Sequence, residues 1–327
     1  MALKQQLLEI FEKNKGIYFS GEHLAKELYV SRNAVWKTVK ALKDSGYDIS
    51  AVTNKGYCLS ADNDILSPQS VYSHMTCDGL PFEIEVYESV DSTNNVLKQR
   101  ASKWESEGKV IIANSQTNGK GRSGRSFHSP EGTGLYMSIL LRPKLEADEA
   151  TYITAIAAVA VAEAVEEVAG RLTEIKWVND VFLNGKKICG ILTEASFDME
   201  NGSINYAVLG IGINISAPSG GFPEEIESVA GCIFEKDSPA GTKSKIAALV
   251  LENFWRHYIS IKEKSFLDGY KKRSMTVGNN VTIHTAGRSD RAAYAMDIDD
   301  CCRLIVKTED GEIKTISSGE VSVKPIK

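Results

Sequence analysis

The chain has 327 residues, of which 43% are hydrophobic and 25% are charged, and its formal net charge is −5. These values are typical of an ordinary globular protein with room for about two or three domains, and the negative balance excludes a generalised nucleic-acid-binding surface. The six cysteines show no C-x-x-C spacing, the first residues do not resemble a signal peptide, and the most apolar helical stretch, residues 153–161, is too short to span a bilayer, so we expect a cytoplasmic protein with no zinc ribbon and no membrane partner.

The first 60 residues differ from the rest of the chain in charge. They contain nine Lys or Arg and six Asp or Glu, a balance of +3, whereas the remainder carries −8. Apolar residues at helical spacing predict a first helix that ends at Gly16, a second helix over residues 20–28, and a third over residues 32–45 that is capped by Ser31. Two short helices joined by a tight turn are typical of a helix-turn-helix, whose second helix enters the DNA major groove.

Two short predicted strands within residues 49–59, joined by an Asn-Lys-Gly turn, add a wing to these helices. Winged helices bind DNA, although the same unit also serves as a protein–protein module. Cations off the apolar stripe of the third helix favour DNA, but the bases that are read do not follow from the sequence. The candidate DNA contacts are Ser31, Arg32, Asn33, Lys37, Lys40 and Lys55.

A polar linker follows the wing, and we place a domain boundary near residue 64. Beyond it, a predicted strand over residues 83–87 leads to Ser92-Thr93-Asn94, before a helix predicted over residues 96–104. Ser92 or Asp91 would cap this helix. Alternatively, the short polar side chains would bind the polar head of a ligand, and both interpretations can hold at once.

A glycine-rich segment over residues 116–127 follows an apolar run at residues 110–113. Glycines let the backbone approach a ligand closely, and the interleaved Lys120, Arg122 and Arg125 with free backbone N–H groups would bind an anion. The segment also matches the dinucleotide fingerprint G-x-G-x-x-G, which requires a helix to begin at the loop. Pro130 and further glycines argue against that helix, so we reject a dinucleotide oxidoreductase. A solvated basic loop remains the alternative on this segment alone.

The next segments alternate between strands and one long helix. We predict a strand over residues 135–142, a buried helix over residues 149–170, and a hairpin whose Asn184-Gly185 turn presents Lys187 beside Gly190. A further buried strand over residues 206–215 contains glycines that permit close approach. Short alternating segments from residue 277 onward predict a small β domain.

Five motifs, taken in order, resemble the biotin–protein ligases. The motifs are Ser92-Thr93-Asn94, Gln116…Gly119-Lys120-Gly121-Arg122-x-Gly124-Arg125, Lys176-Trp-x-Asn179-Asp180, Lys187-x-x-Gly190-Ile-Leu and Gly210-x-Gly212-x-Asn214. Each is weak alone, but together they span most of the chain. With the winged helix in front, the chain resembles the bifunctional bacterial type, which is also the biotin operon repressor. The resemblance implies an α+β multidomain fold: a winged helix over residues 1–64, a central α/β ligase domain with a mixed sheet over residues 65–272, and a small SH3-like β-barrel over residues 273–327.

The resemblance also implies an activity. The central domain would join biotin to ATP, with Mg²⁺, to form biotinyl-5′-adenylate, and would then pass the biotinyl group to one lysine of a biotin carboxyl carrier protein. Lys and Arg at fixed positions would bring the carboxylate and the triphosphate together. The adenylate would order the glycine loop and promote a homodimer that binds the operator DNA of biotin genes.

Site residues are carried over by position. Lys187 and Arg122 would contact the carboxylate and α-phosphate, and Arg125 the nucleotide phosphates. Asn179 and Asp180 would hold the metal or the acceptor lysine, with Mg²⁺ held mainly by ATP; a strand end with a salt bridge is the structural alternative for Asp180. The substrate-binding set is Ser92, Thr93, Asn94, Gln116, Gly119, Lys120, Gly121, Arg122, Arg125, Lys187, Gly190, Gly210, Gly212 and Asn214.

Several positions depart from the family pattern. Lys120 stands in place of an arginine, Phe127 in place of a tryptophan and Val178 in place of a proline, and Cys301-Cys302 lies where a glycine turn is common in the barrel. These changes bear on ligand affinity rather than on the class of reaction. Two other functions stay open: a lipoate–protein ligase, and a ligand-sensing repressor without turnover.

Overall fold

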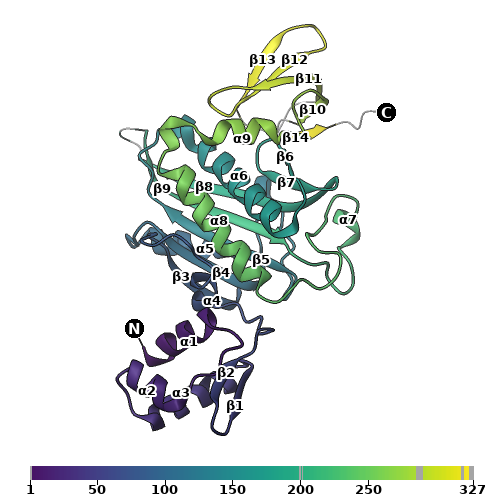
Figure 1. The fold of residues 1–327 in the computed structure, drawn as a ribbon. Helices are drawn as coiled ribbons and strands as arrows, with labels where there is room; N and C mark the ends of the chain where they lie inside the picture. The colour runs from purple at the N-terminus through teal and green to yellow at the C-terminus, as the bar shows by residue number, and fades with distance from the viewer. Residues whose placement is uncertain (1, 199, 201, 285–289, 318–319, 324–327) are drawn as a thin grey trace. The chain divides into compact units, whose positions relative to one another are not determined.

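The structure, a computed structural model, describes residues 2–198, 200, 202–284, 290–317 and 320–323. The chain divides into two compact units, Met1–Asp78 with Ser238–Leu249, and Gly79–Asp237 with Val250–Lys327. Figure 1 labels the helices and strands of both units. Among the described residues, no helix is both long and apolar enough to cross a membrane.

The N-terminal unit contains the predicted winged helix. Ser20 and Ser31 begin the second and third helices by accepting the N–H groups of His23 and Ala34, and an antiparallel hairpin forms the wing. Apolar side chains from all three helices, among them Phe11, pack into one core. The elements are α1 (Leu3–Lys13), α2 (Gly21–Glu27), α3 (Arg32–Asp44), β1 (Ile49–Val52), β2 (Gly56–Leu59) and α4 (Pro68–Tyr72).

A seven-stranded sheet forms the centre of the second unit, in the order β3-β4-β5-β9-β8-β7-β6. β3 and β4 are parallel and the other neighbours are antiparallel, so the prediction of a mixed sheet is confirmed. The strands are β3 (Glu83–Val90), β4 (Lys109–Gln116), β5 (Gly134–Leu141), β6 (Glu174–Lys176), β7 (Asp180–Leu183), β8 (Lys186–Phe197) and β9 (Ile204–Asn214).

Helices cover both faces of this sheet. Adjacent residues of a strand point to opposite faces, and on β8 Glu194 bonds to α5 whereas Thr193 bonds to Thr154 of α6. The buried helix α6 matches the prediction for residues 149–170. The helices that follow α4 in the chain are α5 (Thr93–Ala101), α6 (Ala150–Ala169), α7 (Glu224–Glu227), α8 (Thr242–Tyr258) and α9 (Phe266–Lys272), with 3-10 turns η1 (Arg122–Gly124), η2 (Ala147–Glu149) and η3 (Ile261–Glu263). The first half of α8 belongs to the first unit and the second half to the second unit.

The start of α5 corrects the sequence prediction. The helix begins at Thr93, three residues before the predicted start, and ends at Ala101 rather than at residue 104. The Ser92 side chain accepts no capping hydrogen bond from the described backbone, so its predicted capping role is wrong. Instead, the Gln116 side chain accepts the Thr93 N–H at 2.9 Å. A residue from another strand thus starts this helix, which a local pattern cannot predict.

The last part of the second unit is a five-stranded antiparallel sheet in the order β13-β12-β11-β10-β14. It forms the small C-terminal β domain that the alternating pattern predicted. Cys302 adopts a left-handed conformation (φ +57°) in the turn between β11 and β12. The strands are β10 (Asn280–His284), β11 (Arg291–Ile298), β12 (Leu304–Thr308), β13 (Ile313–Ile316) and β14 (Glu320–Val323).

Candidate functional site

A cavity of about 530 Å³ opens over the central sheet, a size within the range of small-molecule sites. Its walls come from the glycine-rich loop, the start of α5, and parts of β6 to β9. Side chains of β10 and β14 from the C-terminal sheet also line it. The predicted residues that line it are Ser92, Thr93, Asn94, Gln116, Lys120, Gly121, Arg122, Arg125, Asn179, Asp180, Lys187, Gly190, Gly210 and Gly212.

The cavity is strongly cationic. Lys and Arg residues from three separate segments line one space, with the carboxylate of Asp180 as the single acid among the lining residues that the structure describes. A concave site with this balance attracts anions, and the guanidinium groups suit phosphate or carboxylate oxygens. The cations are Lys120, Arg122, Arg125, Lys176 and Lys187.

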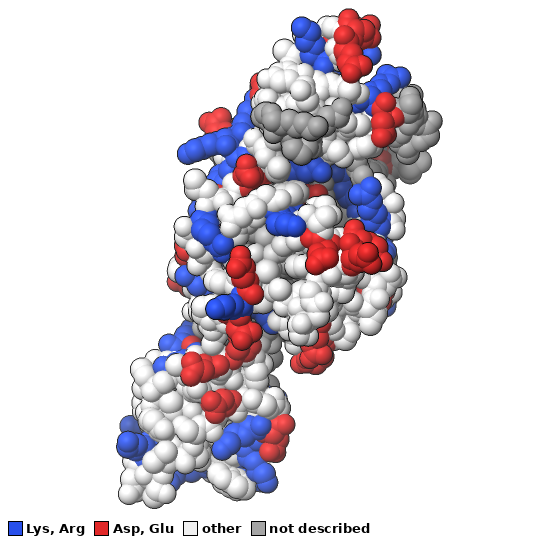
Figure 2. Space-filling model, turned by 90° about the vertical axis from the view of Figure 1, so that its right-hand side faces the viewer, with Lys and Arg blue, Asp and Glu red and all other residues white. Residues whose placement is uncertain are grey.

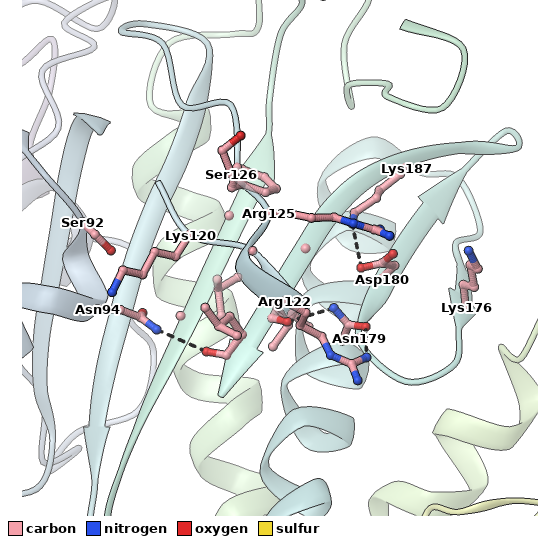
Figure 3. Close-up of a pocket in the computed structure, with 18 of the residues that line it drawn as sticks. Ser92, Asn94, Lys120, Arg122, Arg125, Ser126, Lys176, Asn179, Asp180 and Lys187 are labelled. Carbon is pink, nitrogen blue, oxygen red and sulfur yellow. Dashed lines mark hydrogen bonds and ion pairs between the residues drawn. The ribbon is translucent and has the colours of Figure 1, made fainter. Parts of the chain in front are cut away.

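Arg122 is held in place by Asn179 (Figure 3). Arg122 Nη1 donates to Asn179 Oδ1 at 2.9 Å, and Asn179 Nδ2 in turn donates to the Ile191 carbonyl at 3.0 Å. The Asn179 backbone carbonyl also accepts the Ile191 N–H at 3.0 Å. Asn179 is therefore anchored to β8 through both side chain and backbone, and it orients the guanidinium of the glycine loop.

Lys187 and Asp180 form an ion pair across the β7–β8 hairpin, with 2.8 Å between Nζ and Oδ1 (Figure 3). Asp180 is 18% exposed, and its buried Oδ1 receives no directed hydrogen bond from the described part of the chain. The lysine is thus the main compensation for this carboxylate. The ion pair at the start of β7 is the structural alternative that the sequence offered for Asp180.

The described residues around the cavity do not form a magnesium site. Among those described, no group of three or more His, Cys, Asp or Glu side chains lies close enough to hold a metal ion. Asp180, the predicted candidate ligand, already contacts the Lys187 ammonium. A magnesium ion prefers several oxygen ligands in an octahedron, and the described cavity lining offers one carboxylate, that of Asp180, which is already paired with Lys187.

Glycines form the floor of the cavity because other atoms occupy the space of their side chains. A Cβ on Gly210 would lie 2.2 Å from Asn94 Oδ1, and a Cβ on Gly212 would lie 2.4 Å from the Phe127 ring. Gly190 pairs with Gly212 across β8 and β9, and its Cβ would lie 3.1 Å from the same ring. The Phe127 ring therefore lies directly over two paired glycines.

Asn94 is fixed by protein partners. Ser138 Oγ donates to Asn94 Oδ1 at 2.6 Å, and Asn94 Nδ2 donates to Glu194 Oε2 at 2.9 Å. Burial raises the pKa of Glu194, but hydrogen bonds from Lys98 and Asn94 outweigh this effect and hold the pKa below its ordinary value. Glu194 therefore stays ionised and holds the Asn94 amide, whose position shapes the cavity wall.

The glycine-rich segment is joined to the start of α5 through Gln116 and Lys120. The Gln116 amide bridges Thr93 and Ser129, and Lys120 Nζ donates to Asn95 Oδ1 at 2.5 Å. At its centre, η1 is a single 3-10 turn rather than an α-helix. This confirms the rejection of the dinucleotide fingerprint, which needs a helix to begin here.

Two predicted residues lie outside the cavity lining. Gly119 serves the turn itself, since a Cβ there would lie 2.4 Å from the Phe127 carbonyl oxygen. Asn214 Nδ2 donates to the Gly231 carbonyl at 2.9 Å, so it holds the segment that follows α7. Neither residue forms part of the cavity wall: Gly119 allows the turn, and Asn214 holds a backbone segment.

Sequence reasoning missed several lining residues. Lys176 and Trp177 were visible within a recognised motif, but His284 and Ser322 come from the C-terminal sheet, and no local signal connects them to the cavity. His284 Nε2 lies 2.8 Å from Ser322 Oγ. The full set outside the predicted residues is Ser126, Phe127, Lys176, Trp177, Ile191, Leu192, Ile211, His284, Val321 and Ser322.

Trp177 connects the cavity to the C-terminal sheet. Its indole Nε1 donates to the Cys302 carbonyl at 2.9 Å, and its backbone N–H donates to Thr276 Oγ1 at 3.0 Å. The neighbouring Val178 carbonyl accepts a hydrogen bond from Tyr270 Oη at 3.0 Å, and burial raises the pKa of this phenol, so it donates as the neutral group. These bonds position the turn that carries Asn179 and Asp180.

The predicted DNA-binding residues lie in the N-terminal unit, and all of them are exposed. Ser31 caps α3, and Lys55 lies in the wing turn, with its Nζ 5.8 Å from the centre of the Tyr18 ring. The other four, Arg32, Asn33, Lys37 and Lys40, lie on α3.

Three family models match successive parts of the chain. Residues 4–58 match an HTH domain, residues 86–214 match the Biotin/lipoate A/B protein ligase family, and residues 278–324 match a Biotin protein ligase C terminal domain. The three matches cover the winged helix, the central sheet with its cavity, and the C-terminal sheet.

Similar proteins match over most of the chain. The bifunctional ligase/repressor BirA of Bacillus subtilis is 32% identical over 325 residues, which cover 98% of each chain. The protein of the same name from Escherichia coli is 28% identical over 94% of each chain. The structure of a biotin protein ligase from Aquifex aeolicus in complex with biotin and ATP is similar with a TM-score of 0.60 and 30% identity, covering 74% of this chain and 98% of that one. This chain therefore belongs to the biotin/lipoate protein ligase family, and it matches the bifunctional ligase/repressors of that family over nearly its whole length.

Proposed function

We propose that this protein is a bifunctional biotin–protein ligase and repressor. It activates biotin with ATP to biotinyl-5′-adenylate, transfers the biotinyl group to a lysine of a biotin carboxyl carrier protein, and represses biotin genes through its winged helix. The observation that carries this proposal is the near-full-length match to bifunctional ligase/repressors, in a chain whose cationic cavity contains the glycine loop and Lys187.

The cavity suits the first half-reaction because two anions must meet there. A carboxylate oxygen attacks the α-phosphorus of ATP, and pyrophosphate leaves. Fixed positive charges stabilise the developing charge best when they need no reorganisation. Arg122, already oriented by Asn179, is the group we assign to the α-phosphate, and Lys187 is the group we assign to the carboxylate.

The Lys187–Asp180 pair suggests how the second half-reaction is prepared. When Lys187 turns to an anionic ligand, the half-buried Asp180 carboxylate loses its partner at 2.8 Å. An uncompensated carboxylate attracts a cation, and the ammonium of the acceptor lysine carries that charge. After this lysine loses a proton, its amine attacks the carbonyl carbon of the mixed anhydride, and AMP leaves.

Magnesium enters this proposal through the nucleotide. The described residues form no metal site, so we assign Mg²⁺ to the ATP phosphates, where it would neutralise charge. The role of this chain's own residues is to bind and orient the two anions.

The remaining assignments are part of the same proposal. We assign residues 1–64 to DNA binding, 65–272 to catalysis and 273–327 to the C-terminal β domain. The protein acts in the cytoplasm as a homodimer whose formation the adenylate promotes, and the dimer binds operator DNA. His284 and Ser322, which line the cavity, make the C-terminal sheet part of the ligand site.

Intact-mass analysis of a biotin carrier domain tests the enzymatic part. The carrier is incubated with this protein, Mg-ATP and biotin, and a parallel reaction contains lipoate. We expect a gain of one biotinyl group that requires ATP and is absent with lipoate. A gain only with lipoate would favour the lipoate–protein ligase, and a protein that binds biotin without releasing pyrophosphate would be a ligand-sensing repressor.

A further inference from the structure

The outer face of α3 carries four residues in a row. Asn33, Trp36, Lys37 and Lys40 stand at i, i+3, i+4 and i+7, the spacing that places side chains on one face of a helix. All four are exposed, whereas Val35, Val39 and Leu42 form the opposite, buried face. This row is therefore the surface that α3 presents to whatever it binds.

Trp36 is the unusual member of the row. Its side chain is 51% exposed and adds nothing to the core of the unit, while Lys40 Nζ lies 5.8 Å from its ring centre. Tryptophan is enriched at binding interfaces, because its ring joins a large apolar surface to a polar N–H group. Asn33 lies one turn before Trp36, near the N-terminal end of α3, the end that contacts base edges in helix-turn-helix proteins.

The charge around this row fits a duplex. Lys37 and Lys40 stand within it, Arg32 starts the helix, and Lys55 lies on the wing. Figure 2 shows Lys and Arg side chains on both sides of a largely uncharged stretch in the lower part of the N-terminal unit, with Asp or Glu side chains beside those on one side. Cations that flank an uncharged surface suit phosphates on either side of a groove.

The groups that each base pair presents in the major groove determine which bases this row of α3 residues can recognise. Asparagine pairs with the N6 and N7 edge of adenine, and the C5-methyl group of thymine is the apolar group that the groove presents. Trp36 offers an apolar ring edge at this face, while the flanking lysines suit phosphate oxygens. We propose that Asn33 and Trp36 together read adjacent A·T pairs, with Asn33 on an adenine and Trp36 against a thymine methyl group.

This inference rests on the repressor half of the proposed function and adds the bases that are read. It makes Trp36 a specificity-determining residue, beside the predicted set Ser31, Arg32, Asn33, Lys37, Lys40 and Lys55. The competing use of an exposed tryptophan is a protein interface, and the two differ in a simple way. Only a DNA contact responds to the removal of a methyl group from the duplex.

The test begins with selection. Full-length protein with biotin and Mg-ATP enriches a 40-base-pair duplex from a random pool, and each thymine of the enriched sequence is then replaced by deoxyuridine, which lacks the C5-methyl group. We expect a loss of affinity of about fourfold at one or more thymines, the value of one buried methyl group. In Trp36→Ala and Trp36→Gln, deoxyuridine at the same positions changes affinity by less than about 1.5-fold, because the apolar partner is already absent.

The matched control is Trp104→Ala. Trp104 is 80% exposed and lies against the Arg142 guanidinium in the second unit, so it is a cation-paired surface tryptophan outside the winged helix. This variant should enrich the same sequence with the same deoxyuridine effects. Asn33→Ala should relax the preference for adenine beside the thymine that responds to Trp36. If a winged-helix variant still biotinylates the carrier domain, its ligase domain is folded. Its helical circular dichroism signal, compared with that of the wild type, shows whether the winged helix is folded.

The outcomes separate the inference from the function beneath it. If the wild type enriches a sequence but its deoxyuridine effects persist in both Trp36 variants, the reading of thymine by Trp36 is wrong while repression stands. The reading of thymine is also wrong if Trp36→Ala changes only self-association in sedimentation, which would make the ring a protein interface. If the wild type enriches no sequence, the repressor function fails and the inference fails with it.

Discussion

The glycine-rich loop and the floor of the cavity both contain several glycines, but Gly124 of the loop and the floor glycines are required for different reasons. In the loop, Gly124 has φ +75° and open space around it, so the backbone conformation requires glycine there. In the floor, Gly210 and Gly212 lack such a conformation but have no room for a methyl group. The loop carries cations on a backbone that turns sharply, and the floor glycines leave room for the side chains of Asn94 and Phe127. Substitutions can separate these two roles.

The largest effect is expected at the floor. In Gly210→Ala, the new methyl group would meet Asn94 Oδ1, which Ser138 holds at 2.6 Å. Because this neighbour cannot move without losing a buried hydrogen bond, we expect the free energy of unfolding to fall by about 3 kcal/mol. Urea denaturation measures it. The matched control is Gly190→Ala, where the neighbours are side chains of Phe127 and Lys187 at 3.1 Å and beyond. If the free energy of unfolding falls no further in Gly210→Ala than in Gly190→Ala, the hydrogen bonds around Asn94 do not form a rigid network.

A substitution in the loop should weaken the retention of the adenylate rather than lower the free energy of unfolding. Arg122→Ala removes the guanidinium that Asn179 orients, and we expect adenylate retention to weaken about 30-fold, the value of one hydrogen bond to a charged group. Arg122→Lys keeps the charge but loses the planar fork, so it should recover part of this loss. Release of labelled adenylate from the protein gives the rates. Unchanged retention in Arg122→Ala would remove this residue from the site.

Gly212→Ala should have a smaller effect on stability than Gly210→Ala. Its Cβ would lie 2.4 Å from the Phe127 ring, but this ring is a side chain at the cavity and can turn away. We expect the free energy of unfolding to fall by about 1.5 kcal/mol. Gly212→Ala combined with Phe127→Ala should restore most of the loss, since the clash is then removed. A double-mutant cycle by urea denaturation measures this coupling, and strictly additive losses would contradict the packing described for Phe127.

The smallest effect is expected at Gly124. A methyl group there meets open space but would be held in a left-handed conformation, which costs about 1 kcal/mol for a residue with a Cβ. Gly124→Asn should cost less, because asparagine tolerates this conformation better. Thermal denaturation compares the two. A loss in Gly124→Ala as large as in Gly210→Ala would mean that space is also lacking at Gly124, as it is at Gly119.

Local chemistry made the winged helix predictable. Ser20 and Ser31 cap their helices because a short side-chain oxygen can accept the N–H three residues on. The Asn184-Gly185 turn forms as predicted, with φ values of +51° and +73°, because these residues tolerate the left-handed region. In each case the deciding atoms lie within a few residues of one another.

The start of α5 shows where such reasoning ends. The pattern placed it at residue 96, yet the helix begins at Thr93 because the Gln116 side chain, from β4, accepts the first free N–H. Similarly, Asn214 matched a family motif, but its amide bonds to Gly231 behind the cavity. No spacing within either segment reveals these partners.

The sequence by itself determined the helices, the hairpins and the order of motifs that defines the family, since periodicity, capping and turn chemistry act over a few residues. Only the tertiary structure decided which glycines need space, which cation is held by Asn179 and which by Asp180, and that His284 of the C-terminal sheet reaches the cavity. These properties depend on atoms that folding brings together from distant segments, and burial and close packing act between such atoms whatever their separation along the chain.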